Sequence, residues 1–161
     1  MQPQKTPGLK IDPMDITLSE KTFEVKASRD RVWRLIGKVI FSSLPGLENM
    51  EILDENTFRA LLKMKLFGLG IDLKLQGEMV DMLPPESFAV RLLLEGPGGL
   101  FETGQKVSFV MTPGDNNWTR VSCKAIVENL GFFPRLILLG QARHFAQSTF
   151  ESIEKRLKEL A

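Results

Sequence analysis

Residues 135–160 read RLILLGQARHFAQSTFESIEKRLKEL, and this stretch decides the fold because it is the only long helical pattern in the chain. Its charged and amide side chains occupy one face. Its apolar residues recur every three or four positions and share the opposite face, namely Leu139, Ala142, Ala146, Phe150, Ile153, Leu157 and Leu160. Such a helix extends roughly 39 Å at 1.5 Å per residue, which is long enough to cross a small sheet.

The chain before this helix consists mainly of segments in which apolar and polar residues alternate. Alternation is typical of strands with one buried face and one solvated face. It predicts seven strands, at residues 17–27, 48–53, 58–66, 71–79, 88–94, 107–111 and 121–127. The short, Gly- and Pro-containing gaps between them favour antiparallel hairpins over parallel crossovers. Two short helices are expected after the first strand, one fading near Gly37 and one over residues 39–43.

These patterns predict one α+β domain in which the long helix covers the buried face of the sheet. A chain of 161 residues is the size of a single domain. Residues 1–15 contain Pro3, Pro7 and Pro13 among polar residues and are expected to form a flexible arm. The folded domain is therefore expected to span residues 16–161.

Composition excludes several classes of function. The net charge is +1 with interspersed charges, which does not favour nucleic-acid binding. The single cysteine, Cys123, excludes an internal disulfide, and with the single histidine, His144, it gives no zinc ligand set. We therefore expect no metal and no covalent cofactor. The first residues lack a signal-peptide core, and no apolar run reaches the ~18 residues of a membrane span, so a cytoplasmic protein is expected.

Several local motifs, taken in order, resemble one known superfamily. They are Phe23-x-Val25-x-Ala27 before Val32-Trp33, the corner Leu44-Pro45-Gly46, Leu66-Phe67-Gly68 followed by Gln76-Gly77-Glu78, and Leu130-Gly131-Phe132 before the last helix. With the order of elements, they resemble the START-like (helix-grip, SRPBCC) superfamily, and within it the carbon monoxide dehydrogenase G-subunit family. The resemblance covers residues 20 to 160.

This resemblance implies a sheet curled around the long helix, with an apolar cavity between them. Superfamily members hold lipids, sterols or polyketides in such cavities. The G-subunit family is associated with maturation or membrane tethering of a molybdenum-containing dehydrogenase and with carrying a quinone to it. The resemblance therefore implies a non-catalytic carrier of a lipid or isoprenoid quinone, located in the cytoplasm and peripheral to the inner face of the membrane.

The inward-facing strand residues and the start of the last helix are the candidate ligand contacts. The apolar candidates are Leu62, Met64, Leu73, Leu75, Met79, Val90, Leu92, Phe109, Phe132, Phe133, Leu136, Leu139 and Gly140. Gln105, Thr149 and Arg143 are the candidate orienting polar groups, since most ligand pockets are apolar with a few such groups. The cavity mouth is expected between the start of the last helix and the strand ends near Gly68 and Gly96.

Two other classes of function stay open. A cyclase or hydrolase in the same cavity would need a buried acid or base. The pattern favours Asp81, predicted to point inward, over His144, which has no orienting carboxylate nearby; burial of Asp81 or Glu95 in a cleft with a raised pKa would support the enzyme. The other class is a pure interaction module, which a closed core without a cavity would favour.

Overall fold

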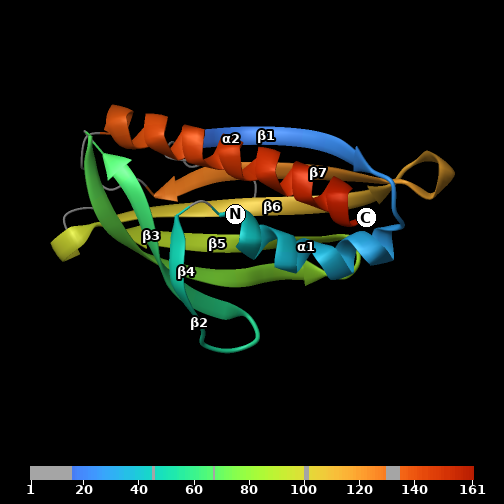
Figure 1. The fold of residues 1–161 in the computed structure, drawn as a ribbon, viewed down its shortest axis with the longest axis horizontal. Helices are drawn as coiled ribbons and strands as arrows, with labels where there is room; N and C mark the ends of the chain where they lie inside the picture. Colours follow the sequence, from blue (N-terminus) through green and yellow to red (C-terminus); the bar gives the residue numbers. More distant parts are fainter. Residues whose placement is uncertain (1–15, 45, 67, 100–101, 130–134) are drawn as a thin grey trace, which may run out of the picture.

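A computed structural model describes residues 16–44, 46–66, 68–99, 102–129 and 135–161. Seven strands form one antiparallel sheet, and two helices lie on one side of it (Figure 1). The order of elements is β1 (Ile16–Val25), α1 (Arg29–Ser43), β2 (Leu47–Ile52), β3 (Thr57–Leu66), β4 (Leu69–Leu83), β5 (Ser87–Glu95), β6 (Glu102–Pro113), β7 (Thr119–Asn129) and α2 (Arg135–Leu160), with 3₁₀ turns at Pro97–Gly99 and Asp115–Asn117.

The predicted seven-stranded antiparallel sheet is confirmed. Its strand order is β1-β7-β6-β5-β4-β3-β2, so each strand from β2 to β7 pairs with the next in sequence and β1 closes against β7. Alternation directs every second side chain of a strand toward the helices. In β5, for example, Val90, Leu92 and Leu94 are buried while Arg91 and Leu93 are exposed.

One continuous helix replaces the two short helices predicted after the first strand. Ser28 caps α1 by accepting a hydrogen bond from the backbone N–H of Arg31. The helix then runs through Gly37 because the residues around this glycine bury one face, and that packing outweighs its poor helix propensity. Leu44 ends α1 in an extended conformation, as expected for a residue that precedes proline.

The corner after α1 requires glycine at position 46. Gly46 has φ +78°, and a Cβ atom there would collide with the backbone carbonyl of Lys63. The backbone N–H of Lys63 donates to the carbonyl of Gly46 at 2.9 Å, which joins the corner to β3. This close approach directs the chain from α1 into the edge strand β2.

The long helix α2 covers the sheet as predicted and packs beside β1 and α1 (Figure 1). Phe150 is 1% exposed and Leu157 is 0% exposed, and Ile153 between them is also buried. An ion pair between Lys21 of β1 and Glu154 (3.0 Å) and a hydrogen bond from Arg31 of α1 to the carbonyl of Leu160 (3.0 Å) join α2 to its neighbours. The core therefore lies between the sheet and the two helices.

Candidate functional site

A cavity of about 60 Å³ lies in this core where α1, α2 and the sheet meet. Its walls come from both helices and from five strands, so no single hairpin forms it. The lining residues are Gly37, Ile40, Phe41, Leu44, Phe58, Met79, Val90, Leu92, Gln105, Val107, Phe109, Ala125, Phe145, Ala146, Thr149, Phe150 and Ile153.

Two helical stripes position one wall of the cavity. Gly37, Ile40 and Phe41 occupy positions i, i+3 and i+4 of α1, which lie on one face of a helix, and Leu44 follows directly after its end. Residues 145–153 of α2 contribute a second stripe of the same period. Inward-pointing residues of β3 to β7 close the opposite side, since alternate side chains of a strand point to the same face.

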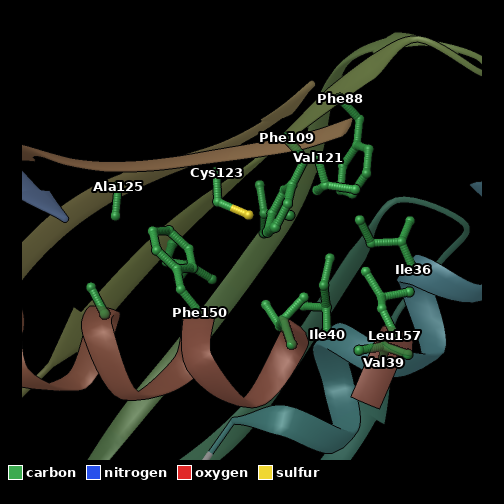
Figure 2. Close-up of a cluster of buried hydrophobic side chains, with 14 of the residues drawn as sticks. Ile36, Val39, Ile40, Phe88, Phe109, Val121, Cys123, Ala125, Phe150 and Leu157 are labelled. Atoms are coloured by element: carbon green, nitrogen blue, oxygen red, sulfur yellow. The ribbon is translucent and has the colours of Figure 1, made fainter. Parts of the chain in front are cut away.

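Aromatic rings form much of the frame around the cavity. Phe109 stacks on Phe88 with ring centroids 4.9 Å apart and meets Phe150 edge-on at 6.3 Å. Figure 2 shows Phe150 pointing from α2 toward Cys123 and Ala125 on the sheet. These ring contacts join β5, β6 and α2 beside the cavity.

The polar side chains in the lining are those of Gln105 and Thr149, two of the three orienting groups expected from the sequence. Gln105 is 5% exposed and Thr149 is 7% exposed. The hydroxyl of Thr149 has no hydrogen-bond partner among the described residues. A buried polar group without a partner costs about 1–3 kcal/mol. Arg143, the third candidate, is exposed and does not line the cavity.

The predicted apolar contacts fall into three groups. Met79, Val90, Leu92 and Phe109 line the cavity. A second group packs elsewhere in the core and consists of Leu62, Met64, Leu73 and Leu75. Met64 is half-buried, and the other three are buried. In the last group, Phe132, Phe133 and the side chain of Leu136 lie outside the described residues, whereas Leu139 is half-buried and Gly140 is exposed.

Sequence reasoning missed the contribution of α1 to the cavity. The signal was present, since Ile40, Phe41 and Leu44 follow the same period as Gly37. The prediction of two short helices that break near Gly37 meant that the helical period across this glycine was not recognised. The expected contribution of Gly140 is not found, because Gly140 is exposed and is not among the described residues that line the cavity.

The candidate acid and base residues lie outside the cavity. Asp81 was predicted to point inward, but it is exposed and forms an ion pair with Lys106 at 3.0 Å. The physical reason is its positive φ of 52° at a register shift between β4 and β5, which interrupts the alternation. Glu95 is half-buried and His144 is exposed.

The thiol of Cys123 is buried on the inner face of β7, as its place in the strand pattern predicts. Burial raises its pKa to about 12, so the thiolate that reacts with electrophiles is not formed near neutral pH. Among the described residues, no group of three or more His, Cys, Asp or Glu side chains could hold a metal ion. Neither helix in the described ranges is long and apolar enough to cross a membrane.

Comparisons with known proteins identify a family for the sequence. The family model for the G subunit of carbon monoxide dehydrogenase (CoxG) matches residues 22–158. A search among curated proteins finds no matching sequence.

Solved structures share the fold at low sequence identity. A conserved protein from Geobacillus kaustophilus has a TM-score of 0.69 at 18% identity, over 87% of this chain and 94% of that one. A START superfamily protein from Mycobacterium smegmatis has a TM-score of 0.61 at 17% identity, over 89% and 98%. The Zhui aromatase/cyclase from Streptomyces sp. R1128 has a TM-score of 0.60 at 15% identity, over 89% and 94%. The fold is therefore the START-like helix-grip fold.

Proposed function

Since the chain belongs to the CoxG family of carbon monoxide dehydrogenase G subunits, we propose that it is a non-catalytic carrier of an apolar small molecule, a lipid or an isoprenoid quinone. The observation that carries this proposal is the apolar cavity inside an otherwise packed core. Protein interiors are normally packed as densely as organic crystals. At about 24 cal/mol per Å³, a void of about 60 Å³ costs about 1.4 kcal/mol, which a bound cargo would offset.

The size of the cavity sets a condition on binding. An apolar protein cavity that accepts benzene measures about 150 Å³, whereas this one measures about 60 Å³. A quinone ring therefore requires the lining to move. Met79, Phe41 and Phe145 are only half-buried, and the unbranched side chain of Met79 can change rotamer readily. Met79 is therefore the lining residue that can adapt most readily, whereas Phe41 packs edge-on against Phe58 with ring centroids 5.0 Å apart.

Filling the cavity from α1 tests the proposal. A Cβ atom at Gly37 meets nothing within 4 Å, so Gly37→Leu adds a side chain at the cavity wall without a clash at Cβ. Leucine also has the higher helix propensity. We expect this variant to stay folded and to lose most of its cargo. Lys38→Leu is the matched control, because it places the same side chain on the exposed face of α1.

The measurement is native mass spectrometry after incubation with a total lipid extract of bacterial membranes. Wild type and Lys38→Leu should carry an extractable apolar adduct, and Gly37→Leu should carry less than about a fifth as much. If wild type carries no adduct, or if Gly37→Leu retains as much as the control, the cavity is not the binding site.

We extend the proposal to a membrane source and a redox partner for the cargo. Leu69, at the start of β4, is 68% exposed. This strand begins at the same end of the molecule as α2 (Figure 1), and an apolar side chain there suits contact with a bilayer surface. Family membership supports delivery to a molybdenum-containing carbon monoxide dehydrogenase.

Two assays address these finer points. Leu69→Asp should reduce co-sedimentation with vesicles of anionic phospholipid, whereas Ile52→Asp, an equally drastic change at an exposed residue of β2, should not. Equal loss in both variants would contradict contact through Leu69. Quinone-loaded protein should raise the rate of quinone reduction by a purified dehydrogenase of this type, and an equal rate with unloaded protein would contradict delivery.

The two other classes of function receive less support. The enzyme hypothesis requires a buried acid or base at the cavity, and none of its described lining side chains is ionisable. The interaction-module hypothesis requires a core without a cavity. The apolar cavity favours the carrier over both.

A further inference from the structure

We propose that Thr149 and Gln105 form a polar subsite that selects a neutral cargo carrying a carbonyl or hydroxyl oxygen on an otherwise apolar body. This inference rests on the proposed carrier function and names the chemistry of the cargo. The subsite combines two buried polar side chains from opposite sides of the same cavity, one on α2 and one on β6.

The hydroxyl of Thr149 lacks the hydrogen bond that a buried threonine usually forms. A threonine inside a helix commonly donates to the backbone carbonyl one turn earlier, but Oγ1 of Thr149 has no partner among the described residues. Thr119 shows the usual outcome for a buried threonine in this protein. It is fully buried, and its Oγ1 donates to the carbonyl of Ala27 at 2.7 Å.

The position of Thr149 distinguishes it from Ser43, the other residue with a buried hydroxyl that has no described hydrogen-bond partner. Ser43 also has a buried Oγ atom without a described partner, but it lies at the end of α1 and does not line this cavity. Thr149 lies on the cavity wall between Ala146 and Ile153, on the stripe of α2 that faces the sheet. A ligand in the cavity is therefore the partner that Thr149 can reach.

Gln105 supplies the complementary groups. Its amide offers two donors and one acceptor, and the threonine hydroxyl offers one donor and two acceptor positions. A ligand carbonyl could accept hydrogen bonds from both residues, and a ligand hydroxyl could donate to either. A purely hydrocarbon ligand would leave the hydroxyl of Thr149 without a partner, which gives the cavity a means of discrimination.

The lining also excludes charged ligands. None of the described lining residues carries an ionisable side chain, so a carboxylate or phosphate inside would have no counter-ion. The cargo class is therefore narrower than lipids in general. It includes molecules with a neutral oxygen function and excludes the acidic end of a fatty acid or phospholipid from this cavity.

Shape-matched probes test the subsite. Acetophenone and α-methylstyrene have the same outline, but the second replaces the carbonyl oxygen with a CH₂ group; benzoate carries a negative charge instead. Their affinities are measured by NMR titration of the methyl groups of Ile40, Val90 and Ile153 in wild type, Thr149→Val and Gln105→Met. Thr112→Val is the matched control, because it makes the same change at an exposed position of β6.

We expect the preference for acetophenone over α-methylstyrene to fall about five- to tenfold in Thr149→Val, the size of one neutral hydrogen bond, and to be unchanged in Thr112→Val. Benzoate should bind at least about tenfold more weakly than acetophenone. Thr149→Val should melt no lower than wild type without ligand, since it removes an unpartnered hydroxyl. 1-Phenylethanol then tells whether a hydroxyl can replace the carbonyl: an affinity equally sensitive to Thr149→Val supports a hydroxyl cargo as well.

The same titrations distinguish a wrong subsite from a wrong carrier function. If both neutral probes bind and their preference is unchanged in Thr149→Val and Gln105→Met, the subsite is overturned while the carrier function stands; a bound water that satisfies Thr149 would give this result. If neither probe shifts the cavity methyl groups of wild type, both proposals are wrong.

Discussion

Replacing Phe150 with alanine should destabilise the fold and create a binding site for benzene. Phe150 is 1% exposed, lines the cavity and meets Phe109 edge-on at 6.3 Å. Burial of its side chain contributes about 1.5–3 kcal/mol, and the ring pair adds about 1 kcal/mol. The enlarged void brings the expected loss to about 4 kcal/mol, within the range of about 3–5 kcal/mol for such truncations.

Urea denaturation and thermal melting measure this loss. For a domain of this size, about 4 kcal/mol corresponds to a decrease in melting temperature of about 8–16 °C. Leu160→Ala is the control on the same helix, because Leu160 is exposed and should lose less than about 1 kcal/mol. A loss below about 1 kcal/mol for Phe150→Ala would refute the assignment of this face of α2 to the core.

The enlarged cavity provides a second readout. The existing void of about 60 Å³ would join the space left by the phenyl ring and approach the volume that accepts benzene. Saturating benzene should therefore raise the melting temperature of Phe150→Ala, because a ligand that binds only the folded state stabilises it. Wild type should respond much less. An equal response in both proteins would contradict the expected enlargement of the cavity.

Three further predictions concern individual residues. Because burial raises the pKa of Cys123 to about 12, iodoacetamide at pH 8.5 should leave the folded protein unmodified and label it in urea; labelling at equal rates would contradict the buried thiol. The hydrogen bond from Lys158 lowers the pKa of Glu154. The ionised Glu154 therefore stabilises the fold, by less than about 1 kcal/mol for a partly exposed pair, above the unfolded pKa of about 4.3, and this contribution is lost as pH falls through the lower folded pKa. The melting temperature of Glu154→Gln should therefore fall less with acid than that of wild type, and an unchanged pH profile would refute this. Gly46→Ala should lose more than about 1 kcal/mol, since it combines a positive φ with a collision at the Lys63 carbonyl; a neutral effect in urea would contradict the close corner.

The sheet and the long helix could be predicted because each follows a regular period over many residues. In β5, alternation between positions such as Arg91 and Leu92 states directly which face is buried. In α2, the recurrence of Phe150, Ile153 and Leu157 does the same for a helix. In both cases the pattern is local, and the fold has only to bring the apolar faces together.

The cavity was harder to predict because it depends on how elements cross. Leu73 and Leu92 have equally apolar strand environments in sequence and both are buried, yet of the two only Leu92 lines the cavity. The outward direction of the Asp81 side chain could not be predicted from the sequence either, because one positive φ reverses that direction without changing the pattern of residues. By contrast, Gln105 and Thr149 were identifiable as polar residues at apolar positions.

Binding of an apolar cargo in the cavity between α1, α2 and the sheet is tested most directly by intermolecular nuclear Overhauser effects. The measurement uses methyl-labelled protein and an unlabelled 1,4-benzoquinone that carries one isoprenoid unit. We expect effects between the ligand and the methyl groups of Ile40, Val90 and Ile153, which line the cavity. Effects confined to exposed methyl groups such as those of Ile52 and Leu69 would contradict binding in the cavity.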